Sequence, residues 1–133
     1  MASIFSKIVA GEIPAYKVAE NDEFLAFLDI NPMAKGHTLV IPKQEIPYIF
    51  DVEDDLLGRM MVFAKKVAKA VEKSIPCARI GVGVVGLEVP HCHIHLIPLQ
   101  NSVGEMNFGG PKLSPSQEEL AEVAQNIKKN FEN

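Results

Sequence analysis

Three histidines within five residues give this chain its clearest chemical potential. They occupy every second position of His91-Cys92-His93-Ile94-His95. Because successive side chains of a strand point to opposite faces, this spacing predicts the three imidazoles on one face and Cys92 and Ile94 on the other. Near pH 7 an imidazole can donate or accept a hydrogen bond, carry a proton or attack an electrophile. We therefore expect the functional groups of the protein along this strand.

Three interpretations of the histidine row compete. A purely structural row would bury several polar nitrogens that all need partners, with no function in return. A zinc site could use His91, His93 and His95, or two of them with His37, although carboxylates at ligand-like spacing are missing nearby. Phosphoryl chemistry is the third interpretation, because neutral imidazole is nucleophilic and its phosphoramidate is labile.

The composition narrows the class of protein. The 133 residues are 47% hydrophobic and 23% charged, as expected for a folded domain with a substantial core. A formal net charge of -4 without a Lys/Arg cluster argues against binding to nucleic acid, but not against a small nucleotide. The chain contains neither a bilayer-spanning apolar stretch nor a secretory signal, and its two cysteines suggest no disulfide framework. We expect a cytoplasmic protein without a membrane partner.

The elements that must position the histidines form an α+β pattern. A short helix is predicted over 3–10, a long one over 52–74 with Asp51 as N-cap, and a last one that Ser114 caps after a loop over 100–113. Strands are predicted over 16–19, 23–28, 37–41, 79–85 and 91–98. We expect one domain over 1–133, with a core over about 3–99. Its mostly antiparallel five-stranded sheet carries two main helices over one face, plus the short N-terminal helix.

The segment from His91 to Ile97 resembles the signature of the histidine triad (HIT) nucleotide-binding family, in its bacterial branch. Other segments are similar to that family in the expected order, so that the resemblance covers roughly residues 3–99. They are Ile4-Phe5-x-x-Ile8, Glu12-Ile13-Pro14, Ala26-Phe27-Leu28-Asp29-Ile30-Asn31-Pro32 and Gly36-His37-Thr38-Leu39-Val40-Ile41-Pro42-Lys43.

The resemblance implies a HIT-like fold and a two-step hydrolysis or transfer at the α-phosphate of a nucleotide. His93 would attack phosphorus and form a nucleotidyl-imidazole intermediate, which water then cleaves. His95 would contact the phosphate and pass a proton to the leaving group. His91 and His37 would orient the row and stabilise charge on the phosphoryl oxygens. The scheme needs no metal or other cofactor.

The resemblance also implies the nucleotide contacts. Asp29 would accept hydrogen bonds from the ribose hydroxyls, although on composition alone it is a turn residue before Asn31-Pro32. Gly86 would admit a close phosphate, and the backbone N–H groups of Glu88 and Val89 could donate to it. The base slot would be apolar and formed by residues that are otherwise simply core: Phe5, Ile8, Phe27, Leu28 and Ile30.

The chain departs from the family pattern in two places. Ser3, Ser6 and Glu45 stand where many bacterial relatives carry ligands of a structural zinc, and hydroxyls are poor zinc ligands, so we expect no such site. Ile80, Leu87 and Glu88 replace residues that usually donate to the phosphate or leaving group. Glu88 could pair with a cationic leaving group or remain a solvated loop residue.

We therefore expect a homodimeric hydrolase that cleaves nucleoside phosphoramidates or related adenylated compounds to a purine nucleoside monophosphate. The dimer comes from the resemblance alone. A dinucleoside polyphosphate hydrolase is the near alternative, and a non-catalytic nucleotide-binding or sensing module and a zinc-dependent hydrolase are the more distant ones. The sequence leaves the physiological substrate and the base preference open.

Overall fold

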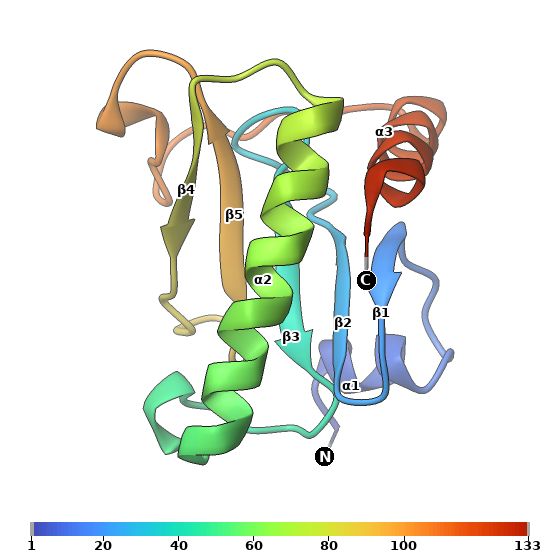
Figure 1. The fold of residues 1–133 in the computed structure, drawn as a ribbon, viewed down its shortest axis with the longest axis vertical. Coiled ribbons are helices and arrows are strands. Elements are labelled where there is room, and N and C mark those ends of the chain that lie inside the picture. The colour runs from blue at the N-terminus through green and yellow to red at the C-terminus, as the bar shows by residue number, and fades with distance from the viewer. Residues whose placement is uncertain (1, 133) are drawn as a thin grey trace.

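The computed structural model describes residues 2–132, in which five antiparallel strands and three helices form an α+β fold (Figure 1). The strand order is β1-β2-β3-β5-β4, so that β1 and β4 are the edges. The strands are β1 Lys17–Glu20, β2 Phe24–Leu28, β3 Thr38–Pro42, β4 Arg79–Gly83 and β5 Ile94–Leu99. The helices are α1 Ile4–Val9, α2 Asp54–Ser74 and α3 Gln117–Asn130, with single 3-10 turns at Ile49–Asp51 and Val103–Glu105. The predicted fold class is confirmed.

Strand pairing brings the histidine segment to the middle of the sheet. β5 lies between β3 and β4, where His95 is paired with Leu39 on one side and with Gly83 on the other. The β1–β2 hairpin forms at the predicted turn, where the Asn21 side chain accepts hydrogen bonds from the backbone N–H groups of Glu23 and Phe24. The pairing therefore positions His95 next to a strand residue without a side chain.

The two main helices cover one face of the sheet. Figure 1 shows α2 lying over the sheet, tilted with respect to the strands, with α3 near the β1 edge. Met60, Ala64, Val67 and Val71 recur at helical spacing on α2 and are buried against the sheet, as their period predicts. Met61 is 48% exposed and lies outside this stripe. The long apolar stripe of the helix is thus a core contact.

The opposite face is covered in part by the short N-terminal helix. Phe5 and Ile8 of α1 pack against the side chains of β2 and β3 that point away from α2, namely Leu25, Phe27, Leu39 and Ile41. All five residues of β2 are buried because both faces of that strand are covered. Ser3 caps α1 by accepting a hydrogen bond from the N–H of Ser6, and Gly11 follows the helix with φ of 81°, as predicted.

Two helix starts differ from the sequence prediction. Residues 49–51 form a separate 3-10 turn, and α2 begins at Asp54 rather than after an Asp51 cap, because Val52 is extended and buried. The N-cap of α3 is Ser116 rather than Ser114, and Glu119 closes the capping box. A carboxylate at that position also interacts favourably with the helix dipole, which the amide of the alternative Gln117 does not.

The histidine strand is shorter than predicted. Its regular ladder starts at Ile94, so His91, Cys92 and His93 precede it. In this approach segment the N–H of Cys92 donates to the carbonyl of Ile46, outside the sheet. The alternation of faces nevertheless holds. Ile94 and Leu96 point into the core under α2, whereas the rings of His91 and His93 lie against Phe5 of α1.

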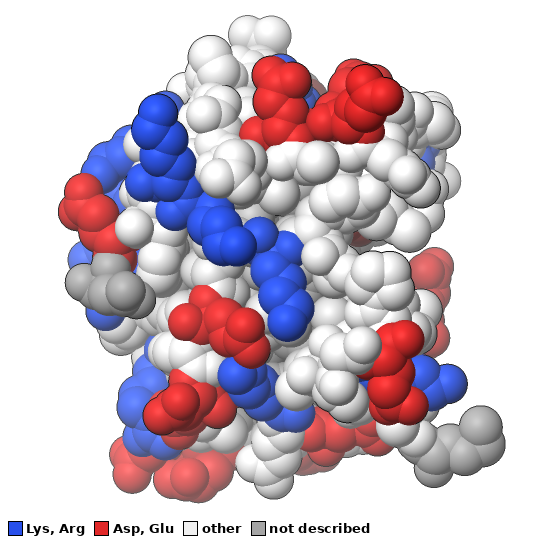
Figure 2. All heavy atoms as spheres, turned by 90° about the vertical axis from the view of Figure 1, so that its right-hand side faces the viewer, with Lys and Arg blue, Asp and Glu red and all other residues white. Residues whose placement is uncertain are grey.

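The charged side chains form no broad basic surface on the face that contains α3. Figure 2 shows a short band of Lys and Arg there, bordered by Asp and Glu. Several of the basic groups in the chain are paired, for example Lys43 with Glu20 at 2.7 Å and Arg59 with Glu23 at 2.8 Å. Within residues 2–132, no helix is both long and apolar enough to cross a membrane.

Candidate active site

His93 and His95 lie at one end of a pocket of about 290 Å³. The pocket is open between α1 with its following loop, the ends of β2 and β3, and the loop before the histidines. Its wall is mainly apolar, with two carboxylates near the histidine end. The lining residues are Ile4, Phe5, Ile8, Ile13, Pro14, Ala15, Phe27, Leu28, Asp29, Ile30, Leu39, Glu88, Val89, His93 and His95. This combination suits a flat apolar ligand with a polar end.

The tautomer of His93 follows from its hydrogen bond. Its Nδ1 lies 2.8 Å from the carbonyl oxygen of His91, which can only accept. Nδ1 therefore carries the proton, and Nε2 has a free lone pair. Phe5 packs edge-on against the imidazole, with ring centroids 5.0 Å apart, and limits its rotation. The result is an oriented imidazole with a nucleophilic nitrogen.

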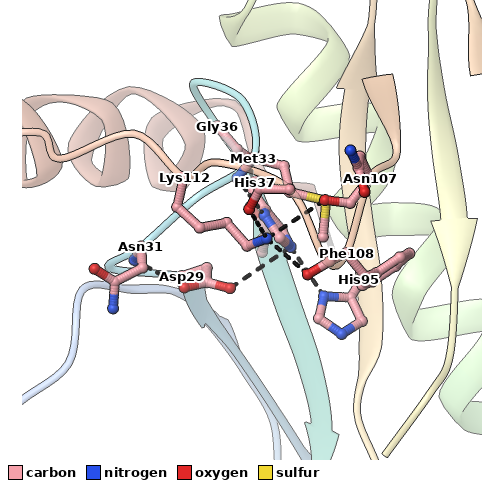
Figure 3. Close-up of polar contacts among 11 residues, drawn as sticks. Asp29, Asn31, Met33, Gly36, His37, His95, Asn107, Phe108 and Lys112 are labelled. Atoms are coloured by element: carbon pink, nitrogen blue, oxygen red, sulfur yellow. Dashed lines mark hydrogen bonds and ion pairs between the residues drawn. The ribbon is translucent and has the colours of Figure 1, made fainter. Parts of the chain in front are cut away.

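The tautomer of His95 is determined by a chain of two hydrogen bonds. The backbone N–H of Met33 donates to Nδ1 of His37 at 3.1 Å, so the proton of His37 is on Nε2. That Nε2–H donates in turn to Nδ1 of His95 at 2.9 Å. The remaining proton of His95 is therefore on Nε2. His93 and His95, with ring centroids 4.9 Å apart, thus form a neighbouring acceptor and donor (Figure 3 shows His37 and His95).

His91 is held at the other end of the row. Its Nε2–H donates to the carbonyl of Pro42 at 2.7 Å, and its Nδ1 accepts from the Ser3 hydroxyl at 2.9 Å. Ser3 and Ser6 are joined through Glu45, whose Oε1 accepts from the Ser3 N–H at 2.6 Å and from the Ser6 hydroxyl at 2.7 Å. The three positions that stand in place of zinc ligands are thus linked by hydrogen bonds to one another and to His91.

Burial lowers the pKa of His37, His91 and His95 and so favours their neutral form. The pKa of His37 is lowered to about 3 and that of His95 to about 4, mainly by burial and in smaller part by neighbouring positive charge, including that of Lys112. The pKa of His91 is also lowered by burial, against the opposing effect of the Pro42 carbonyl. The pKa of Glu45 falls to about 2 because the backbone N–H of Ser3 and the hydroxyl of Ser6 donate to its carboxylate. Neutral imidazoles are the form that the hydrogen-bond chain requires.

Asp29 lies beside the His95 end of the row. One of its oxygens accepts from the N–H of Asn31 at 2.9 Å, while the other lies 3.8 Å from Nε2 of His37 (Figure 3). Burial raises the pKa of this carboxyl. Asp29 is therefore a turn residue, as composition suggested, and at the same time lines the pocket with one free oxygen.

Among the described residues, the side chains of Asp29, His37 and His95 are grouped closely enough to hold a metal ion, with ligand atoms within 4.8 Å of one another. The two imidazole nitrogens in it, 2.9 Å apart, already share a proton. Tetrahedral zinc with Zn–N bonds of about 2.0–2.1 Å would separate them to about 3.3 Å. The arrangement fits a hydrogen bond better than a pair of zinc ligands.

The structure brings most of the residues singled out in the sequence to this pocket, but not all of them. His37 and His91 are almost completely buried and do not line the pocket: His37 is hydrogen-bonded to His95, and His91 to Ser3 and to the carbonyl of Pro42. Ile30 is at the rim, 58% exposed. Gly86, with φ of 71°, lines a neighbouring groove instead. Ile80 packs against the core under α2, so a side chain at this position does not face the histidines.

Two residues near the histidines were not anticipated from the sequence. Phe108 packs edge-on against His95 with ring centroids 4.8 Å apart, and Lys112 lies between Asp29 and His95 (Figure 3). Both belong to the region that was predicted only as a glycine-containing loop. The motif Asn107-Phe108-Gly109-Gly110 indicates a turn but contains no signal for its distant partner.

Comparison with known proteins agrees with this geometry. Residues 10–102 match the family model of the HIT domain. The chain is 37% identical to a HIT-like protein of Borreliella burgdorferi (96% of this chain and 97% of that protein). It is also 37% identical to an adenosine 5'-monophosphoramidase of Schizosaccharomyces pombe, over 96% of each chain. The crystal structure of a Hit-like protein from Bartonella henselae superposes with a TM-score of 0.85 at 33% identity, covering 97% of this chain and 96% of that one. The fold and the histidine row define a histidine triad protein, and the chain belongs to the HIT family.

Proposed function

We propose that this protein hydrolyses nucleoside phosphoramidates, or related adenylated compounds, to a purine nucleoside monophosphate through a nucleotidyl intermediate on His93. The observation that carries the proposal is the order of hydrogen bonds along the row. It leaves a lone pair on Nε2 of His93 and a proton on Nε2 of His95, at the end of an apolar pocket. The similarity to fungal monophosphoramidases supports the same class of reaction.

In the first step, Nε2 of His93 attacks the α-phosphorus. The new bond is P–Nε2, and the bond that breaks joins phosphorus to the leaving nitrogen, which departs as a neutral amine if it is already protonated in the bound substrate. The phosphorylated imidazole is then a cation, and its Nδ1–H remains bonded to the carbonyl of His91. Water attacks phosphorus in the second step, the P–Nε2 bond breaks, and the proton of water is released. His93 thereby returns to its initial tautomer.

We propose that His95 donates a hydrogen bond in this reaction rather than a net proton. Its Nδ1 accepts from His37, and His37 accepts from the backbone N–H of Met33, so neither ring can easily take up a second proton. The Nε2–H of His95 is suited to a phosphoryl oxygen or the leaving atom, where it stabilises the charge that develops in the transition state.

The pocket wall suits the rest of a nucleotide. We propose that Phe5, Ile8, Phe27 and Leu28 contact the base and that the free oxygen of Asp29 accepts from a ribose hydroxyl. The scheme uses no cofactor. We further propose one domain over 1–133, a cytoplasmic location and a homodimer with a continuous sheet. A continuous sheet needs a free edge, and β4 is an edge strand on which Val82 is 53% exposed.

The decisive experiment replaces His93 by alanine. We expect His93→Ala to keep its fold and bind AMP but to lose about 10⁶-fold in turnover, as other enzymes do when a covalent nucleophile is removed. The substrates are adenosine and guanosine phosphoramidates and dinucleoside polyphosphates, each assayed with and without a chelator. Quenched wild-type protein, digested in alkali because the adduct is acid-labile, should carry one added AMP on the peptide that contains His93.

Three outcomes would contradict the proposal. An adduct on His91 or His95 would overturn the assignment of the nucleophile. Loss of turnover with a chelator and its recovery with zinc would favour a zinc-dependent hydrolase. Tight binding of AMP with no turnover of any substrate would identify a nucleotide-binding module.

A further inference from the structure

The loop between β5 and α3 closes the site at the end opposite the base pocket. We name residues 103–112 the wall loop. Its Met106 and Phe108 side chains lie on β4 at two glycines. A Cβ at Gly81 would come within 2.5 Å of Met106 Sδ, and one at Gly83 within 3.1 Å of the Phe108 ring. Because Gly83 pairs with His95, the space that this glycine leaves places the Phe108 ring directly beside the imidazole of His95.

The wall loop is fastened by the ammonium group of Lys112. It donates to three carbonyl oxygens of the same loop, at 2.7 Å to Phe108, 3.0 Å to Gly110 and 3.4 Å to Asn107. The next residue is tied to the turn after Asp29, since the N–H of Leu113 donates to the carbonyl of Pro32 at 2.9 Å. The loop thus holds a cation at a defined place, and Figure 3 shows this cation pointing between Asp29 and His95.

The charge of Lys112 is not cancelled within the loop. Its three hydrogen-bond acceptors are neutral carbonyls, and among residues 2–132 it forms no ion pair within 4.0 Å. Its charge reaches the site, because it contributes to the lowered pKa of His37 and of His95 and acts against the burial that raises the pKa of Asp29. The site thus combines a cation with the imidazoles of His37 and His95, whose lowered pKa values favour the neutral form. Such a charge favours an anionic ligand.

We propose that Lys112 binds the phosphate of the substrate, with the wall loop as its support. The longest of its hydrogen bonds, at 3.4 Å to the carbonyl of Asn107, is the one that a phosphoryl oxygen replaces. This inference rests on the proposed function. The inference also supplies a phosphate donor in place of those missing at Ile80 and Leu87. Ile80 packs into the core, and Leu87 is 89% exposed. The cation comes from a loop on the other side of His95.

The test compares AMP with adenosine, which lacks the phosphate. Calorimetry should show that Lys112→Met weakens AMP binding by about 10- to 100-fold, the value of one charge-assisted hydrogen bond, and leaves adenosine binding unchanged. Lys112→Arg should restore much of the AMP affinity. Lys35→Met removes an equal charge from the nearby turn and should behave like the wild type.

Lys112→Gln separates the charge from the support of the loop, because its amide can still donate to the carbonyls. If Lys112→Gln binds AMP as tightly as the wild type, the residue only fastens the loop and the proposal is wrong. An equal loss of AMP and adenosine affinity in Lys112→Met would also overturn it. These readouts do not require turnover, so a wild type that binds AMP but turns over no phosphoramidate or dinucleoside polyphosphate contradicts the proposed function and leaves this inference standing.

Discussion

The two ends of the histidine row differ in the hydrogen-bond partners of their rings. At the His91 end, the ring is almost completely buried and hydrogen-bonded to Ser3 and to the carbonyl of Pro42. At the His95 end, the ring is bonded to a second imidazole, that of His37, and faces Phe108. One end uses both nitrogens for the fold, and the other keeps one N–H for a ligand.

This difference assigns separate tasks to similar side chains. His91 holds the start of α1 through its hydrogen bond with Ser3. Its carbonyl accepts from the Nδ1–H of His93 and thereby fixes the tautomer of that ring. The tautomer of His95 is set by His37, the residue directly before β3, so that the Nε2–H of His95 is available. The position of a histidine in the row does not show whether it holds the fold or donates to a ligand. The hydrogen-bond partners of its two ring nitrogens show this.

Between the two ends of the row, the larger predicted effect on turnover comes from substitution of His37, which sets the tautomer at the His95 end. We expect His37→Phe to keep the ring volume but remove the donor to His95, so that the proton of His95 is no longer held on Nε2. Turnover should fall by about 10²- to 10⁴-fold, the range for a positioned donor or base, while AMP affinity changes little. Steady-state kinetics and calorimetry measure the two quantities. A fall in affinity as large as the fall in rate would mean that His37 shapes the pocket and does not orient His95.

The opposite end should respond in stability rather than in rate. Ser3→Ala removes the donor to the buried Nδ1 of His91 and the N-cap of α1. We expect the free energy of unfolding in urea to fall by about 1–3 kcal/mol and turnover of the folded protein to change less than tenfold. Ser6→Ala is the matched control, because its hydroxyl donates to Glu45 at 2.7 Å and lies farther from Nδ1 of His91, at 3.4 Å, than the Ser3 hydroxyl does. A larger rate effect in Ser3→Ala than in His37→Phe would reverse the assignment of the two ends.

The smallest expected effect is a pH dependence of stability. The folded pKa values of His37 and His95 lie near 3 and 4, below the usual value of 6.5, so the unfolded chain binds more protons than the folded one between these limits. Their stabilising contribution is present above pH 6.5 and is lost as the pH falls toward 4, by up to about 1.4 kcal/mol per pH unit and histidine. Urea unfolding between pH 7 and 5 should show this slope, and His37→Gln should have a shallower one. Equal slopes would mean that His37 is not buried as a neutral ring.

Most of the fold could be predicted from the sequence because it depends on local patterns. The helical period over 56–71 and the alternation over 91–98 predict which side chains face the core. The errors lie at element ends, where competing local contacts decide. Val52 is drawn into the core before α2 can start, and Ser116 with Glu119 makes a better capping box than Ser114 with Gln117.

The site was predictable where residues are close in sequence or belong to a family motif. His93, His95 and Asp29 line one pocket, and all three belong to segments that the resemblance singled out. The placement of Phe108 and Lys112 was not predictable, because it depends on two glycines of β4, 25 residues or more away in sequence, that leave space on the sheet. The use of Ser3, Ser6 and Glu45 as a hydrogen-bonded group around His91 likewise depends on long-range contacts that substitution of zinc ligands does not reveal.

The glycines of β4 affect which part of the molecule unfolds locally. An edge strand with Gly81 and Gly83 has little intrinsic preference for extended structure and presents no side chains of its own at those positions. Met106 and Phe108 provide the packing that these glycines lack. We therefore expect the β4 edge of the sheet and the wall loop to unfold locally as one cooperative unit. A ligand that orders the wall loop also protects the edge strand from local unfolding.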